Sequence, residues 1–277
     1  LLEDQLVKDA LEQQGLTVLK LAWDDPNFDW STTKYALFRT TWDYFDRFQE
    51  FAAWLKDVEQ NTILLNSAKT IHWNIDKHYL QDLEKAGVEI VPTYIMEKGD
   101  PRSLAELHKE LGWKQTVLKP CVSGAARHTY KLNAETIAQH ESIFKSLIQD
   151  EAMMLQPFQH NIISQGEVSM MVFNGAYTHS ILKKAKAGDF RVQDDYGGTV
   201  HEYQASEEEV AYAEYAVKSC PEIPIYARVD VFLDNQNKLC LILLKIFFGC
   251  KDLNMQNDLS LYHPVRYIIN TLSKISH

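Results

Sequence analysis

Several features that would identify common classes of protein are missing from this sequence. Its 277 residues include only four cysteines, and no two of them form a CxxC pair. We interpret them as free thiols in a reducing compartment. The ten histidines form no HExxH pattern, and the chain has neither a Walker A loop nor a GxGxxG motif. No arrangement of serine, cysteine and histidine predicts a covalent nucleophile.

Basic residues and long apolar segments are also scarce. Lysine and arginine together number 28 against 38 aspartates and glutamates, which gives a formal net charge of −10. This balance argues against nucleic acid as a partner, although a local basic pocket is compatible with it. The longest apolar run, residues 239–250, is too short to span a bilayer and contains Lys245. Because no signal peptide is visible either, we expect a cytoplasmic protein without a membrane partner.

Helix and strand patterns alternate in the first part of the chain, residues 1–75, which is typical of a parallel α/β sheet. The expected elements are a helix at 2–15, strands at 16–23 and 35–39, a helix at 46–58 and a strand at 62–66. The chain does not begin with methionine, and a unit of this kind usually opens with a strand. We therefore expect that this parallel α/β domain lacks its first strand and the loop that followed it.

The remaining patterns change from mixed to antiparallel along the chain. Two strand patterns meet at Asn174-Gly175, a dipeptide favoured in type I′ hairpin turns. Residues 226–249 predict a second hairpin. No internal repeat or low-complexity linker divides the chain, and we place the domain boundaries at 76–165 and 166–277.

Cations at strand ends, beside turns of small residues, are the main chemical signal. Lys119 ends the strand "QTVLKP" just before Ser123-Gly124-Ala125-Ala126, where backbone N–H groups could approach a phosphate. Lys183 and Arg191 flank a loop that contains glycine and could grip an anion. Arg228 and Asp230 alternate on "YARVD" and face one side of the strand. On spacing alone, solvated lysines, an exposed charged loop and a structural ion pair remain the simpler interpretations.

The order of these segments resembles that of the ATP-grasp superfamily, in particular its glutathione-synthetase-like and RimK-like carboxylate–amine ligases, and the branch with the cycloserine-biosynthesis ligases. The matching segments run over nearly the whole chain: "WDDPNFDW", "FRTTWDY", "WNIDKHYL", "VEIVPT", "VLKPCVSGAARHTY", "LQPF", "GEVSMMVFNGAYTHSILK", "AGDFRVQDDYGG" and "YARVDV". The resemblance implies an α/β chain in which the N-terminal domain precedes a two-subdomain α+β ATP-grasp fold: a central and lid subdomain, 76–165, and a C-terminal subdomain, 166–277.

The resemblance also implies a role for individual residues around an ATP molecule. Residues expected to contact the nucleotide are Lys77 and Lys119, the lid residues Ser123, Gly124 and Ala125, the hinge residues Gln156, Pro157 and Phe158, and Glu167 at the ribose. Cations expected around the transferred phosphate and the substrate carboxylate are Lys183, Arg191 and Arg228. Asp230 matches the first magnesium-binding carboxylate. The implied reaction forms an acyl phosphate from ATP, which an amine then attacks.

The second strand of the 226–249 hairpin departs from the pattern of the relatives. They carry a run resembling E-L-E-L-I-E-P, and its three glutamates are replaced here by Leu243, Lys245 and Phe248. Magnesium usually takes one or two carboxylates in addition to phosphates, so Asp230 alone could still hold an ion. We interpret the hairpin as a magnesium site that has lost ligands. A shift in the alignment, which would bring another acid such as Asp252 to the site, is the alternative.

Three functions remain open on these grounds. The first is an ATP-dependent ligase that joins a small carboxylate to an amine, and the second is a nucleotide-binding pseudoenzyme with a degenerate magnesium site. The third, a purely structural α/β protein, is disfavoured by the retained lysines, the hinge and Arg191. A homo-oligomer is compatible with the sequence. The acid and the amine are not specified, because fold-level analogy gives the type of reaction and not the substrate.

Overall fold

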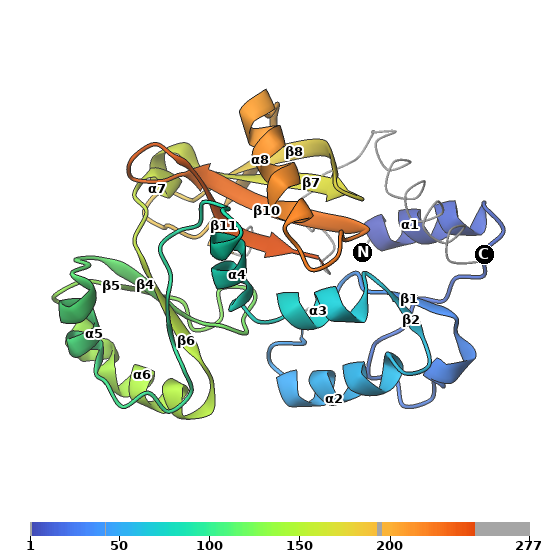
Figure 1. Cartoon of the computed structure of the whole chain (residues 1–277), viewed down its shortest axis with the longest axis horizontal. Coiled ribbons are helices and arrows are strands. Elements are labelled where there is room, and N and C mark those ends of the chain that lie inside the picture. The colour runs from blue at the N-terminus through green and yellow to red at the C-terminus, as the bar shows by residue number, and fades with distance from the viewer. Residues whose placement is uncertain (1, 42, 193–195, 247–277) are drawn as a thin grey trace.

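The chain folds around three β-sheets, which follow one another in the sequence (Figure 1). The computed structural model describes residues 2–41, 43–192 and 196–246. Within these ranges, no helix combines the length and the apolar character needed to cross a bilayer. Each sheet lies within one of the predicted segments, 1–75, 76–165 and 166–277, although the boundaries themselves stay a prediction.

The first sheet has two parallel strands, as the alternating pattern predicted. Its segment contains α1 (Leu2–Glu12), η1 (Trp30–Thr32), β1 (Tyr35–Leu37), α2 (Phe48–Val58), β2 (Ile63–Leu65) and α3 (Ala68–Asn74), and α4 (Tyr79–Lys85) follows directly after it. Helix α2 buries Phe51, Leu55 and Val58, which recur on one helical face. The strand expected at 16–23 is wrong: that segment crosses the surface without joining a sheet, and the side chain of Leu19 is 65% exposed.

The middle sheet has four antiparallel strands in the order β3-β6-β4-β5. Its elements are β3 (Tyr94–Met96), α5 (Leu104–Leu111), β4 (Thr116–Pro120), β5 (Tyr130–Leu132), α6 (Ile137–Asp150) and β6 (Met153–Pro157). Leu107, Phe144 and Ile148 bury the apolar faces of α5 and α6 against Leu118 and Leu155 of the sheet. This sheet therefore has an apolar core of its own.

The third sheet has five antiparallel strands in the order β11-β10-β7-β8-β9. Its segment contains β7 (Glu167–Phe173), β8 (Ala176–Lys184), β9 (Thr199–Tyr203), α8 (Glu207–Lys218), β10 (Tyr226–Leu233) and β11 (Leu239–Lys245), and α7 (Asn161–Gln165) directly precedes it. Both predicted hairpins are present. Asn174 and Gly175 have φ of 49° and 80°, the positive values that a type I′ turn requires.

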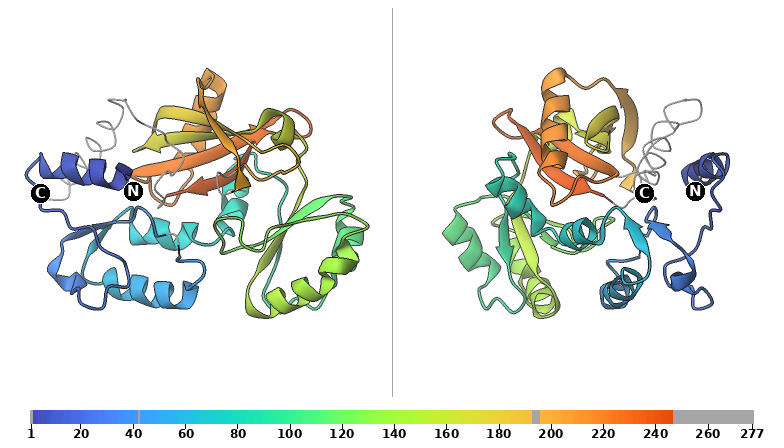
Figure 2. Two further views of the ribbon diagram at one scale, coloured as in Figure 1. Left: turned by 180° about the vertical axis from the view of Figure 1, so that it is seen from behind. Right: turned by 45° about the vertical axis from the view of Figure 1, so that its right-hand side comes forward.

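The sheets are arranged so that the middle one stands apart from the other two. One large apolar core joins residues of the first segment, such as Phe51 and Tyr79, to Val229 and Leu244 of the β10–β11 hairpin. In Figures 1 and 2, the middle sheet with α5 and α6 lies to one side of the five-stranded sheet. Residues 86–93, before β3, and 158–160, after β6, connect these two bodies.

Candidate functional site

A cavity of about 270 Å³ lies between the middle and the five-stranded sheet. All of the site residues predicted from the sequence line this cavity. They are Lys77, Lys119, Ser123, Gly124, Ala125, Gln156, Pro157, Phe158, Glu167, Lys183, Arg191, Arg228 and Asp230. Leu243 and Lys245 line it as well. The structure thus brings together every predicted site residue, and their individual roles stay predictions.

Lys77 is buried at the base of the cavity, in the turn between α3 and α4. Its ammonium donates to the carbonyl oxygens of Cys121 and Ser123, each at 3.0 Å, and to that of Pro120 at 3.4 Å. Burial and, to a smaller extent, the nearby cations Lys119 and Lys245 together lower the pKa of Lys77 to about 7. The three carbonyl acceptors favour the charged form. Lys77 therefore ties the small-residue turn to the rest of the site.

Lys119 lies at the end of β4, and the negative charge of Glu167 stabilises its ammonium. Burial lowers the pKa of Lys119 to about 8, and the carboxylate of Glu167 opposes that shift. Glu167 begins β7 and pairs in register with Lys183 of β8. Gly166 precedes it with φ of +87°, and a Cβ at this glycine would lie 2.4 Å from the carbonyl oxygen of Lys183. This close approach explains why glycine is needed where β7 enters the site.

The small-residue turn after β4 is held by its own hydrogen bonds. Ser123 donates through Oγ to the carbonyl oxygen of Arg127 at 3.2 Å, and the N–H of Arg127 donates to Gly124 at 2.9 Å. Ala125 and Ala126 both have positive φ, of 47° and 56°. A Cβ on Gly124 would lie 2.4 Å from the ring of Phe45, so the turn packs directly on the N-terminal segment. Close packing therefore requires glycine at position 124, whereas the positive φ of the two alanines is a strained conformation for residues that carry a Cβ.

The predicted hinge at 156–158 already forms hydrogen bonds within the protein, through the backbone of Phe158 and the side chain of Gln156. The N–H of Phe158 donates to the carbonyl oxygen of Gln115 at 2.8 Å, and the Phe158 carbonyl accepts from Asn235 at 3.0 Å. The side-chain amide of Gln156 donates to Thr93 at 2.8 Å. The Phe158 ring packs edge-on against Phe190, with centroids 5.7 Å apart. The Phe158 backbone groups are thus already bonded, whereas its ring supplies an apolar wall.

Arg228 and Asp230 form a bidentate ion pair on β10, as their alternation predicted. Nη2 of Arg228 lies 2.7 Å from Oδ2 of Asp230, and Nε lies 2.8 Å from Oδ1. Ser169 of the neighbouring strand donates to Oδ1 at 2.6 Å. Burial alone would raise the pKa of Asp230, but the positive charges of Arg228 and Lys183 outweigh it and lower that pKa. Asp230 is therefore a stable carboxylate whose two oxygens both accept hydrogen bonds.

Arg191 is oriented by two neighbours. Asp189 accepts from its Nη2 at 2.7 Å, and the guanidinium carbon lies 3.6 Å from the ring centroid of Tyr196. The hydroxyl of Tyr196 donates to the carbonyl oxygen of Ala125 at 3.3 Å. This hydrogen bond links the Arg191 loop to the small-residue turn across the cavity.

The β10–β11 register puts the unusual hairpin residues beside Asp230. Leu243 pairs with Asp230 and Lys245 pairs with Arg228, with a bulge after Asp230. Burial and, to a smaller extent, the charge of Arg228 together lower the pKa of Lys245 to about 7. Phe248 and Asp252 lie outside the described residues.

The apolar lining of the cavity was not predicted from the sequence. Val91, Val117, Ile242 and Phe190 contribute to it. The first three are aliphatic residues in or beside strands, and nothing in the sequence distinguishes them from ordinary core residues. Phe190, next to Arg191 in the loop, was the one that its position could have indicated.

Part of the sequence is similar to known proteins. The family description of the D-cycloserine synthetase DcsG N-terminal domain matches residues 2–66. The cycloserine biosynthesis protein DcsG of Streptomyces lavendulae is 29% identical over 184 residues, which are 64% of this chain. The match spans 60% of the length of that curated relative.

Solved structures of similar shape cover nearly the whole chain. The crystal structure of D-cycloserine synthetase DcsG has a TM-score of 0.86 and 23% identity, covering 97% of this chain and 94% of that one. The ATP-grasp ligase PsnB complexed with minimal precursor, Mg and ADP has a TM-score of 0.63 and 16% identity, covering 98% and 95%. The D-alanine–D-alanine ligase of Bacillus anthracis complexed with ATP has a TM-score of 0.60 and 14% identity, covering 84% and 83%.

Proposed function

The chain has the ATP-grasp fold of carboxylate–amine ligases, as the sequence predicted, and from this premise we propose that it binds ATP and uses it to join a small carboxylate to an amine. The observation that carries the proposal is the convergence of all the predicted site residues on one cavity between two sheets. A nucleotide would lie there with its base against Phe158 and its phosphates toward Lys119 and the turn at 123–126. Glu167 would accept hydrogen bonds from the ribose hydroxyls.

The proposed reaction has two steps, both of which depend on positive charge. A carboxylate oxygen of the acid attacks the γ-phosphorus of ATP, the bond to ADP breaks, and an acyl phosphate forms. The amine then attacks the acyl carbon, inorganic phosphate leaves, and the amine loses a proton. The protein's part is to position the reactants and neutralise the charge on the phosphoryl oxygens. Lys183, Arg191 and Arg228 are the cations that we assign to this task.

Magnesium does not fit the described part of this cavity. Both oxygens of Asp230 are occupied by Arg228 and Ser169, and the register opposite Asp230 offers the apolar side chain of Leu243. Lys245 lines the same wall, and an ammonium there repels a dication. Magnesium needs oxygen ligands in near-octahedral geometry. We therefore propose that Lys245, rather than a magnesium ion, neutralises part of the phosphate charge.

A nucleotide-binding pseudoenzyme is the second candidate, and the missing ligand positions at Leu243 and Lys245 favour it. We propose a cytoplasmic location for either function, in keeping with the free thiols of Cys121, Cys220 and Cys240. Small carboxylates and amines are the proposed partners of the ligase, with no part for nucleic acid or membrane. The formation of a homo-oligomer remains open.

Calorimetry with ATP, in the presence of magnesium and in the presence of chelator, tests the nucleotide site first. A phosphate-release screen over amino acids and small carboxylates then separates the two candidates. Turnover with an acid and an amine supports the ligase, whereas tight ATP binding without turnover supports the pseudoenzyme. Failure to bind ATP under both conditions would overturn both.

A further inference from the structure

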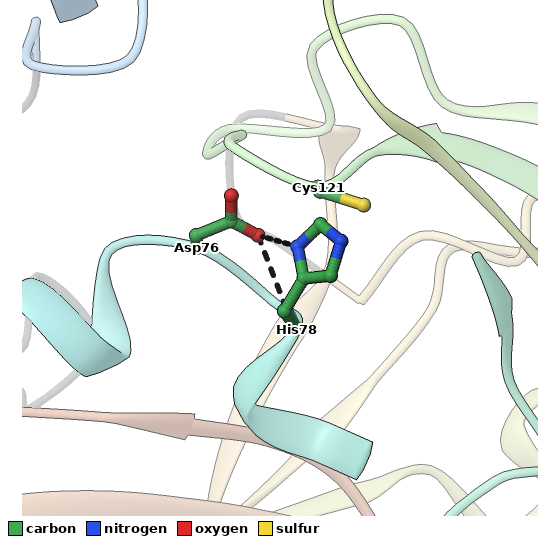
Figure 3. Close-up of side chains that lie close together, drawn as sticks. All are labelled: Asp76, His78 and Cys121. Atoms are coloured by element: carbon green, nitrogen blue, oxygen red, sulfur yellow. Dashed lines mark hydrogen bonds and ion pairs between the residues drawn. The ribbon is translucent and has the colours of Figure 1, made fainter. Parts of the chain in front are cut away.

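Three side chains of different metal-binding chemistry meet outside the cavity. They are the carboxylate of Asp76, the imidazole of His78 and the thiol of Cys121, whose ligand atoms all lie within 4.8 Å of one another (Figure 3). Asp76 and His78 come from the turn between α3 and α4, and Cys121 follows β4. None of the three lines the nucleotide cavity.

The backbone holds these two segments together independently of any ion. The N–H of Lys77 donates to the Cys121 carbonyl at 3.1 Å, and the Lys77 ammonium donates to the same oxygen at 3.0 Å. The N–H of Cys121 donates to Ala152 at 2.9 Å. On the other segment, the N–H of His78 donates to Oδ1 of Asp76 at 3.1 Å. The cluster is therefore pre-organised, which lowers the cost of gathering ligands.

The Cys121 thiol differs from the other described cysteines. Its side chain is 1% exposed, and within the described residues no hydrogen bond reaches its sulfur. The thiols of Cys220 and Cys240, in contrast, contact the carbonyl oxygens of Ala216 and Leu241. Burial raises the pKa of the Cys121 thiol, and the carboxylate of Asp76 raises it further. A bound dication would replace the thiol proton and compensate the negative charge.

The imidazole of His78 is already oriented by two carboxylates. Its Nδ1 lies 2.5 Å from Oδ1 of Asp76, and its Nε2 lies 3.2 Å from Oε1 of Glu97. When one ring nitrogen binds a metal, the other typically donates to a carboxylate that fixes the ring. Glu97 is in a position to accept that bond from Nε2. Nδ1 is bonded to Asp76, and the Cys121 sulfur lies beside the imidazole (Figure 3).

We infer that Asp76, His78 and Cys121 form a binding site for Zn²⁺. Sulfur, nitrogen and oxygen are the ligand atoms that zinc takes, and three protein ligands leave a fourth position for water or a further group. Asp76 and His78 are 37% and 35% exposed, so an ion can reach the site from solvent. On binding, Cys121 releases its thiol proton, and the proton shared by Asp76 and His78 Nδ1 also leaves. The proton on Nε2 of His78 stays in place and donates to Glu97.

This site lies beside the nucleotide cavity but does not depend on the proposed ligase activity. Lys77, between two of the ligands in sequence, bonds the carbonyls of Cys121 and Ser123, and both Lys77 and Ser123 line the cavity. Zinc at the cluster would join the α3–α4 turn to the base of the small-residue turn by a direct bond. We therefore expect zinc to raise the thermal stability of the protein even without nucleotide.

The test uses the full chain, treated with chelator and then titrated with zinc chloride alone. Calorimetry should show one strong site, and His78→Ala and Cys121→Ser should each weaken zinc binding about tenfold or more, because each removes a direct ligand. Cobalt in place of zinc gives a thiolate-to-cobalt absorption band, which Cys121→Ser should abolish. His78 is partly exposed, so its alanine variant should keep the fold even if the Cys121 variant does not.

Two variants serve as matched controls. Cys220→Ser changes another buried thiol, and His72→Ala removes a histidine of α3 that pairs with Glu59 at 2.7 Å on the surface. Both should bind zinc as the unmodified protein does. Zinc binding that is absent, or that survives unchanged in His78→Ala, would overturn the inference. So would an equal loss in the control variants, which would indicate a different site.

Discussion

Lys245 lies directly opposite Arg228 in the β10–β11 hairpin, so two cationic side chains share one wall of the nucleotide cavity. Like charges that face each other across a strand pair are unfavourable. Burial and, to a smaller extent, the charge of Arg228 together lower the pKa of Lys245 to about 7. Asp230, which the resemblance assigns to magnesium, is instead bonded to Arg228. The wall carries cations where the resemblance implies carboxylates.

Changing Lys245 to Glu together with Leu243 to Glu should create magnesium-dependent nucleotide binding. At about 4 Å, two like unit charges cost about 4 kcal/mol at an effective dielectric near 20, and a dication roughly doubles that figure. Removing the ammonium and adding two carboxylates should therefore replace the repulsion of magnesium with attraction. ATP titrations of both proteins, each with magnesium and with chelator, measure the effect.

Lys245→Met is the control for this change, because it removes the cation without adding a ligand. It should show less magnesium dependence than the double glutamate variant. Strong magnesium dependence in the unmodified protein would contradict the account of missing ligands. It would indicate that another acid, such as Asp252, reaches the site.

Lys119→Ala should weaken nucleotide binding about tenfold or more while leaving the protein folded. The lysine ends β4 beside the small-residue turn, and a charged hydrogen bond to phosphate is worth roughly 1.5–3 kcal/mol. Isothermal titration with ATP and with ADP measures the loss, and circular dichroism monitors the fold. Unchanged affinity in a folded variant would refute the contact.

The affinity for nucleotide should also fall as the pH rises through about 8. Burial lowers the pKa of Lys119 to about 8, so its ammonium is fully present below that pH and is lost above it. Because phosphate binds the charged form, affinity decreases in the alkaline direction. Lys119→Arg keeps its charge throughout, since arginine is always protonated in proteins. Comparing the two pH profiles isolates Lys119 from Lys77 and Lys245; identical profiles would refute its part.

The sequence predicted the residues that line the cavity better than their contacts. The motifs located Lys119 near the end of β4, where a sheet leaves side chains free to meet a ligand, and Asp230, which lies within β10 rather than at its end. Spacing also predicted the Arg228–Asp230 pair, since alternate residues of a strand share a face. The engagement of the Phe158 N–H by Gln115 could not be predicted, because it depends on how β4 and β6 are placed in register.

Two other features were beyond the reach of sequence patterns. The segment at 16–23 has the apolar composition of a strand, but a strand also needs a partner for its backbone groups, and tertiary structure decides whether one is available. The cluster of Asp76, His78 and Cys121 joins two segments that are far apart in the sequence, so no metal-binding motif with a characteristic spacing predicts it. Only the fold brings such residues together.

Arg191→Lys should impair the reaction with the acid and amine once they are identified. The guanidinium donates a hydrogen bond to Asp189 and stacks on the ring of Tyr196 at the same time. Lysine reproduces neither planar contact. Steady-state kinetics of phosphate release would show a lower kcat/KM. Asp189→Asn, which weakens the anchor but keeps the arginine, should have a smaller effect. A lysine variant with full activity would contradict the assignment of Arg191 to an anionic group.

Gly124→Ala should destabilise the protein and weaken ATP binding, because the added methyl has no room. A Cβ at this position would lie 2.4 Å from Cε1 of Phe45, which is itself buried. Overpacking of this kind costs typically about 1–3 kcal/mol. Denaturant unfolding measures the free energy change, and Phe45→Leu combined with Gly124→Ala tests its cause. If the clash is responsible, the alanine costs less beside the leucine than beside the phenylalanine. An equal cost in both backgrounds would place the strain in the backbone of the turn instead.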